Sequence, residues 1–381
     1  MIEIKFSPNK SGIIILAIGL IIIFIAAQSF QNMYEEEPLY PSENVTEKKM
    51  LSEYLPELED TPMDTEVYIF KGKEEGGTSL ILGGTHPNEP AGYLTSVVFL
   101  ENMQVNKGKI IIIPRANSSA FTHSSPQEAY PQKFSIEMDD GSEREFRFGS
   151  RTTNPLHQWP DPDVYVHPTG QRLSGSETRN LNRSYPGRED GNLTERLALG
   201  IIKVIEKEEV DISFDLHEAS PEYPVVNAVV SHEKGMDIAS NVSMNMQMQD
   251  VNISLEPSPK GLRGLSHREW GDHTETLPFL LETPNPAQGR LRGTTDQDLV
   301  LSGYDRFYKR SSDLGLLYVR YDENGWPIER RVGRHVASIV EFYNTFSQMR
   351  PGKEIEVADI PTYDELVSQG LAEFLRHPDD N

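Results

Sequence analysis

Three short apolar stretches of the chain end in side chains that could bind a metal ion or transfer a proton. These side chains are His86 and Glu89 after residues 79–84, His217 after residues 214–216, and Glu282 after residues 278–281. Open α/β sheets bind their ligands at the carboxyl ends of such strands. A catalytic zinc ion takes three nitrogen or oxygen ligands and leaves a fourth position for water. His86, Glu89 and His217 supply such a set, which leaves Glu282 as a general base.

Each of these signals is weak by itself. A His and a Glu three residues apart are common by chance, and a histidine at a strand end is more often a hydrogen-bonded structural residue than a ligand. The ordinary interpretation of Glu282 is a solvated or helix-capping carboxylate. The coincidence of all three stretches favours a metal site, with Glu218, next to His217, as the second candidate base.

The cysteine content and the net charge of the chain exclude several classes of site and partner. The 381 residues include no cysteine, which excludes disulfides, thiolate zinc sites and cysteine nucleophiles, so any metal must be held by His, Asp or Glu. The formal net charge of −23 argues against a nucleic-acid partner, which would need a basic surface.

The elements around the candidate residues alternate between strand and helix. Residues 79–84 and 109–114 are continuous apolar runs, typical of strands buried on both faces, and residues 91–103 between them have helical spacing. This order predicts a parallel βαβ unit. The other expected elements are strands at 67–70, 210–216 and 276–282 and helices at 194–208, 334–346 and, more weakly, 362–375. We therefore predict one α/β domain over residues 61–350, followed by an acidic tail at 351–381. The irregular stretch 118–180 is long enough to suggest a functional or flexible insertion.

An apolar segment precedes this domain. Residues 12–30 carry no charge and as a helix would span roughly 28 Å, close to the thickness of the hydrocarbon core. Lysines precede the segment and Glu35, Glu36 and Glu37 follow it, so the positive-inside rule predicts residues 1–11 in the cytoplasm and the catalytic domain outside. We interpret 12–30 as a single-pass anchor in the cell membrane and 31–60 as an acidic stalk. A cleaved signal peptide is the alternative, with small residues near Ala26 at the exit.

Four motifs in fixed order resemble those of the zinc carboxypeptidase superfamily. They are GGTHPNE at 83–89, NLNRSYPG at 180–187, FDLHEA at 214–219 and LLET at 280–283. The chain looks closest to the succinylglutamate desuccinylase/aspartoacylase branch, and the resemblance covers about residues 66–346. It implies a mixed, largely parallel central sheet flanked by helices. Pro87 in place of Gly and Asn180 in place of Asp depart from the usual motifs, as does the long 118–180 segment.

The resemblance also implies roles for individual residues. His86, Glu89 and His217 match the ligands of one zinc ion, and Glu282 matches the general acid and base. Asn182 and Arg183 match a pair that grips the carboxylate of the substrate. An arginine before that pair is expected to polarise the scissile carbonyl, for which we choose Arg172, with Arg179 and Arg151 as alternatives.

Three functions compete on this evidence. The first is a membrane-anchored zinc hydrolase that cleaves an amide bond in an N-acyl amino acid or short peptide with a free carboxylate. The second is a carboxypeptidase acting on peptides, including those of a cell wall. The third, from another class, is a surface binding module that keeps the fold without turnover. The complete set of ligands and base argues against the binding module, which has no need of a base beside the metal.

Overall fold

A mixed β-sheet lies at the centre of the computed structural model, which describes residues 9–124 and 131–377. Within these residues the sheet has nine strands, eight of them in the order β1-β2-β4-β3-β9-β12-β10-β11, with β13 paired to β4. The strands are β1 (Glu47–Met50), β2 (Glu66–Lys71), β3 (Glu74–Leu82), β4 (Gln104–Ile113), β9 (Ile212–Ala219), β10 (Ala228–Ser231), β11 (Ser254–Pro257), β12 (Leu277–Pro284) and β13 (Glu356–Ala358). The central run β4-β3-β9-β12 is parallel, and β1, β2, β10 and β13 join it by antiparallel pairing. The α/β prediction is confirmed.

Helices cover both faces of the sheet. One face packs against α2 (Pro90–Asn102), α4 (Met236–Met248) and α8 (Ile328–Met349), and the other against α3 (Leu193–Lys207) and Trp270 of α5 (Ser266–His273). Alternation along β4 shows why this strand is apolar throughout, since Ile110 and Ile112 enter the first core and Ile111 and Ile113 the second. The prediction that these strands are buried on both faces is therefore correct. The described residues also form three shorter helices, α6 (Gln297–Ser302), α7 (Arg306–Asp313) and α9 (Tyr363–Gln369).

The two acidic segments predicted to flank the domain belong to it instead. β1 pairs with β2, and Leu51 and Leu58 are fully buried against α3, so residues 33–60 are not a free stalk. At the other end β13 pairs with β4, and Leu366 of α9 is buried beside α8. The acidic composition of these segments hides the apolar residues spaced between the charges. Burying those apolar side chains is favourable, and the acidic side chains around them can remain in water.

The insertion at 118–180 contains regular structure within the described residues. Two antiparallel hairpins form in it, β5 (Lys133–Glu137) with β6 (Glu143–Arg147) and β7 (Val164–Val166) with β8 (Arg172–Ser174). Residues 125–130, a part of this predicted segment, lie outside the described residues.

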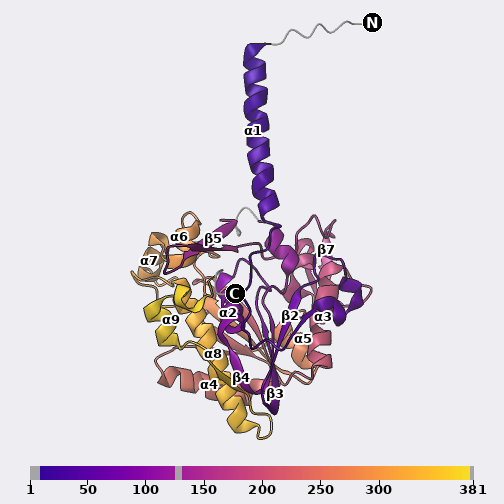
Figure 1. The fold of residues 1–381 in the computed structure, drawn as a ribbon, viewed down its shortest axis with the longest axis vertical. Coiled ribbons are helices and arrows are strands. Elements are labelled where there is room, and N and C mark those ends of the chain that lie inside the picture. The colour runs from indigo at the N-terminus through magenta and orange to yellow at the C-terminus, as the bar shows by residue number, and fades with distance from the viewer. Residues whose placement is uncertain (1–8, 125–130, 378–381) are drawn as a thin grey trace.

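The N-terminal apolar segment forms α1 (Lys10–Asn32), a 23-residue helix with no buried residue. Figure 1 shows it projecting from one end of the domain. Its length and composition suit a membrane span, and a signal sequence would pass the same test. Residues 1–8, most of the segment predicted to be cytoplasmic, lie outside the described residues.

Candidate metal and active site

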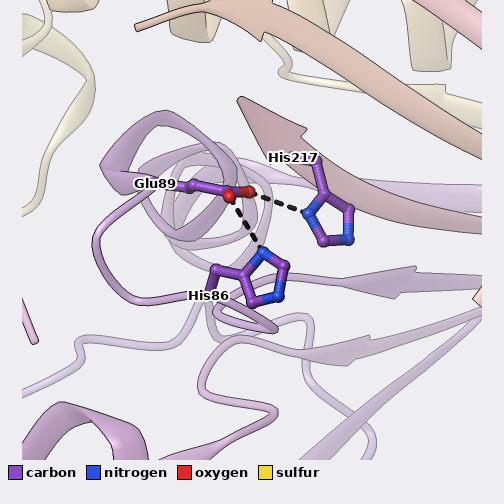
Figure 2. A group of neighbouring side chains, drawn as sticks. All are labelled: His86, Glu89 and His217. Atoms are coloured by element: carbon purple, nitrogen blue, oxygen red, sulfur yellow. Dashed lines mark hydrogen bonds and ion pairs between the residues drawn. The ribbon is translucent and has the colours of Figure 1, made fainter. Parts of the chain in front are cut away.

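The three predicted metal ligands meet at the carboxyl end of the parallel strands. His86 follows β3, Glu89 immediately precedes α2, and His217 lies within β9 rather than after it. The two carboxylate oxygens of Glu89 lie 2.8 Å from His86 Nδ1 and 2.8 Å from His217 Nδ1, as Figure 2 shows. All three side chains are buried, and their potential ligand atoms lie within 4.8 Å of one another. The structure therefore brings the set together from two neighbouring strands and the start of a helix.

Hydrogen bonds on the far side of each ring orient the two imidazoles. His86 Nε2 lies 2.9 Å from Asn180 Oδ1, an oxygen that also accepts the backbone N–H of Asn182 and so must be an acceptor. His217 Nε2 lies 2.8 Å from Asp215 Oδ2. Because an acceptor lies beside each Nε2 atom, a proton held there leaves Nδ1 as the nitrogen that could bind a metal ion. Outer partners of this kind fix the tautomer and orientation of metal-binding histidines.

The electrostatics of the cluster suit a cation. Burial and the nearby Arg151 lower the pKa of His86 to about 4, so its ring is neutral at pH 7. Burial opposes the charged form of His217, but the carboxylates of Asp215 and Glu89 on either side more than offset it and hold its pKa well above the usual value. Two buried carboxylates thus flank one imidazole, and their negative charge, which Arg151 offsets in part, would also stabilise a divalent metal ion.

Glu282 lies beside this cluster on β12, in register with His217 of β9. Its Oε2 atom is buried and has no hydrogen-bond partner within the described residues. Burial raises the pKa of Glu282 to about 8, an effect that His217 opposes and Glu89 reinforces. Glu282 also lines the pocket, and a carboxyl group with a perturbed pKa at such a position is suited to exchange protons with a bound molecule.

Glu218, the second candidate base, is already engaged. It forms a buried ion pair of 2.8 Å with Arg331 of α8 and accepts the backbone N–H of Ala91 at 2.9 Å. These contacts tie β9 to the start of α2 and to α8. We therefore regard Glu218 as a structural residue and retain Glu282 as the base.

The arginine chosen from the sequence needs correction. Arg172 lies on β8, is exposed, and is not among the residues that line the pocket. Arg179 is held by an ion pair with Asp161 at 2.7 Å. Arg151 lines the pocket instead, with Nη1 at 3.2 Å from Glu89 Oε1. Spacing along the chain from Asn182 does not identify this arginine. The insertion folds back on itself, so that Arg151, which is 31 positions before Asn182, lies beside the metal cluster.

Asn182 and Arg183 also line the pocket. Asn182 Oδ1 accepts the backbone N–H of Ser266 at 2.9 Å, and Arg183 Nη1 donates to the Asn182 carbonyl oxygen at 2.6 Å. The carboxylate nearest to the Arg183 guanidinium is that of Glu177, at 3.8 Å. Burial and the charge of Arg151 lower the pKa of Arg183, which indicates that these two guanidinium groups would be stabilised by an anion between them.

The pocket itself is a cavity of about 490 Å³. The metal cluster, Glu282 and the two arginines supply much of its polar lining. Its apolar lining comes from β10, β12 and the segments before β10 and after β11, and includes Val225, Val230, Leu262, Leu265 and Leu280. A molecule with both a charged group and an aliphatic part would fit such a site.

A second group of potential metal ligands lies elsewhere, formed by His232, Glu233 and Asp272. Arg268 Nη1 lies 2.9 Å from Glu233 and Arg263 Nη1 lies 2.7 Å from Asp272. Two arginines already neutralise these carboxylates, so this cluster is an ion-pair network.

Comparison with known proteins gives relatives of the kind that the four motifs indicate. No family model matches the chain. A curated relative, N-alpha-acetyl-L-2,4-diaminobutyric acid deacetylase from Halomonas elongata, is 26% identical over 163 residues, which is 42% of this chain and 33% of that protein. The chain thus matches about a third of the length of this relative.

Similar solved structures include a succinylglutamate desuccinylase from a Silicibacter species, with a TM-score of 0.37 and 17% identity over 60% of this chain and 55% of that chain. An aspartoacylase family protein from Mesorhizobium loti has a TM-score of 0.32 and 20% identity over 58% of this chain and 56% of that one. The tripeptide-bound cell shape determinant Csd4 from Helicobacter pylori has a TM-score of 0.46 and 12% identity over 80% and 59%. Members of the desuccinylase and aspartoacylase branch are therefore among the similar proteins, which confirms the predicted resemblance.

Proposed function

We propose that this chain is a zinc-dependent hydrolase that cleaves an amide bond in an N-acyl amino acid or a short peptide with a free carboxylate. The observation that carries the proposal is the convergence of two imidazole Nδ1 atoms on the Glu89 carboxylate, beside a pocket that also contains Glu282. Two nitrogens and a carboxylate are the donors of a catalytic zinc site that keeps one position open. His86, Glu89 and His217 would hold one ion per chain, which would polarise the amide carbonyl and make its water a better nucleophile.

The side chains around the metal site would carry out proton transfer, stabilisation of the developing charge and substrate binding. Glu282 takes the proton of the attacking water, for which it must be ionised, a form that a cation held by the neighbouring ligands would favour, and it then returns the proton to the leaving nitrogen. Arg151 donates to the oxygen on which negative charge develops. Arg183, with Asn182, binds the free carboxylate of the substrate through a charge-assisted, forked contact. The apolar wall around Leu265 and Leu280 accommodates an aliphatic side chain.

The proposal includes the location of the enzyme. The α1 helix is apolar and none of its residues is buried against the domain. As a single-pass anchor, with lysine before it and Glu35 to Glu37 after it, it would place the catalytic domain on the outer side of the cell membrane.

A panel of amides tests this function on the full-length chain, purified in detergent and loaded with zinc. The panel pairs N-acetyl and N-succinyl amino acids and dipeptides with the same compounds carrying a carboxamide in place of the free carboxylate. We expect hydrolysis of the free acids and at least a tenfold lower kcat/KM for the carboxamides, because those cannot pair with Arg183. Higher kcat/KM for peptides than for acyl amino acids would favour the carboxypeptidase. No hydrolysis by the zinc-loaded chain across the panel would favour a binding module.

A further inference from the structure

The connection between α1 and the domain is tight. Met33, one residue after the helix, is fully buried, and its carbonyl accepts a hydrogen bond from Arg147 at 3.3 Å. The carboxylate of Glu37 is also buried, forms an ion pair with Arg147 and accepts the hydroxyl of Tyr93 at 2.6 Å. Met33 and Glu37 are thus fixed to the domain at either end of the exposed residues 34–36, and a connection this short limits the directions that α1 can take relative to the domain.

This connection lies at the same edge of the sheet as the metal cluster. Arg115, two residues beyond the carboxyl end of β4, donates to the Glu37 carbonyl at 3.1 Å. From Arg147 the chain reaches Arg151, which contacts Glu89 at 3.2 Å, in four residues that span at most about 14 Å. The opposite edge is marked by the ion pair of 3.1 Å between Lys353, after α8, and Asp211, at the start of β9. The catalytic edge of the domain is therefore the edge from which α1 leaves.

Exposed apolar side chains are concentrated in one part of the insertion at this edge. Leu156 and Trp159 are 83% and 75% exposed, and they flank His157, whose ring lies 5.9 Å from that of Tyr34, two residues after α1. Val164 and Val166 of β7 are exposed as well. Figure 1 places β7 at the end of the domain from which α1 projects. We call these four residues (Leu156, Trp159, Val164 and Val166) the apolar rim.

We propose that the apolar rim inserts into the headgroup region of the bilayer that α1 spans, so that the catalytic edge of the domain faces the lipid surface. Trp is the side chain most favoured in this region, because its ring is apolar and its N–H can hydrogen-bond to headgroups and water. Of the two carboxylates between Trp159 and Val164, that of Asp161 is paired with Arg179 at 2.7 Å, which reduces its repulsion from an anionic surface, whereas that of Asp163 is exposed. The inference rests on the anchoring function proposed for α1, since continuity with that helix identifies lipid as what covers the rim.

The tryptophans of the chain provide a direct test. Trp270 and Trp326 are buried, so Trp159 is the one that external quenchers reach. The full-length chain is reconstituted into vesicles of phosphatidylcholine and phosphatidylglycerol in a ratio of three to one, with or without phosphatidylcholine spin-labelled at the headgroup. We expect the spin label to reduce the Trp159 emission at least twofold and aqueous iodide to have little effect. W159F should abolish the response to the spin label.

The matched control is a variant in which the exposed tryptophan is moved from the rim to the opposite edge of the domain. Glu75 is exposed at the amino end of β3, on the edge opposite the rim. In the double variant W159F/E75W, iodide should quench the new tryptophan and the headgroup label should not.

Three results would overturn the inference. If the chain floats with the vesicles while Trp159 responds to iodide and not to the spin label, α1 is an anchor and the rim does not touch lipid. If Trp159 is shielded from both quenchers, a second copy of the chain or another part of the protein covers it. If the chain does not float with the vesicles, the anchoring proposal fails and this inference fails with it. Loss of hydrolysis in the amide panel leaves all of these readouts unaffected, so the proposed chemistry and the membrane contact are tested separately.

Discussion

Replacing Glu282 by Gln separates proton transfer from metal binding. Glutamine keeps the shape of the side chain and one carbonyl oxygen but cannot accept a proton from water. Because proton transfer by a positioned side chain contributes about 10²–10⁴-fold, kcat should fall by that factor while zinc content stays at one ion per chain. KM should change little, because the base acts mainly in the transition state.

The same variant should make the metal-free chain more stable at neutral pH. Burial raises the pKa of Glu282 to about 8 in the folded chain, against about 4.3 in the unfolded one. The unfolded chain therefore gains stability by ionising this carboxyl as the pH rises above about 4.3, whereas the folded chain keeps it protonated up to about pH 8. The free energy of unfolding therefore falls between about pH 4.3 and about pH 8. With allowance for solvent access, the loss at pH 7 is about 2–3 kcal/mol. Glu282→Gln removes this loss, because glutamine does not ionise.

Two assays and one control complete this experiment. Kinetics and elemental analysis are carried out on zinc-loaded protein, and thermal unfolding is followed at pH 5 and pH 8 in the presence of a chelator. The midpoint of Glu282→Gln should exceed that of the parent by several degrees at pH 8 and by less at pH 5. Glu275→Gln, at an exposed position just before β12, should change neither activity nor stability. A variant that keeps more than a tenth of the parent kcat would refute the assignment of the base, and one that loses zinc would show Glu282 to be a ligand.

Three further predictions concern the metal, the arginines and a distant ion pair. His86→Ala and His217→Ala should each lose zinc and activity together, and elemental analysis showing a full complement of zinc in either would contradict the ligand set. Arg151→Ala should lower kcat by about 10²-fold or more, as expected for removing a donor to the oxyanion, while Arg172→Ala, at an exposed position outside the pocket, should match the parent enzyme. Burial opposes ionisation of Glu208, but hydrogen bonds from Tyr54 and Lys109 more than offset it and lower its pKa to about 2. Because the folded pKa lies below the unfolded one, the contribution of Glu208 is complete above about pH 4.3 and lost as the pH falls toward 2. Glu208→Gln should therefore cost about 1–2 kcal/mol in denaturant unfolding at pH 7, allowing for screening by solvent, and an equal loss at pH 2 would contradict this account.

Much of this molecule follows from local pattern. Apolar runs at 79–84 and 109–114 correspond to β3 and β4, and the helical spacing at 91–103 corresponds to α2, because periodicity reports directly on which faces are buried. The position of His86 and Glu89 between β3 and α2 follows from the same pattern. Asp215 could also have been recognised as the partner of His217, since residues two apart on a strand share a face.

Tertiary structure decided the features that depend on contacts between distant segments. The residues around Leu51 and Leu366 have acidic neighbours, a pattern that predicts a stalk and a tail. Leu51 is nevertheless buried against α3, far along the chain, and Leu366 is buried against α8. Arg151 rather than Arg172 reaches Glu89 because the insertion folds back on the sheet, a path that spacing along the chain does not encode. The contact between Tyr34 and His157, which places the apolar rim at the base of α1, joins segments more than a hundred residues apart. Local sequence determines which face of an element is apolar, whereas the partner of that face is selected by packing over the whole domain.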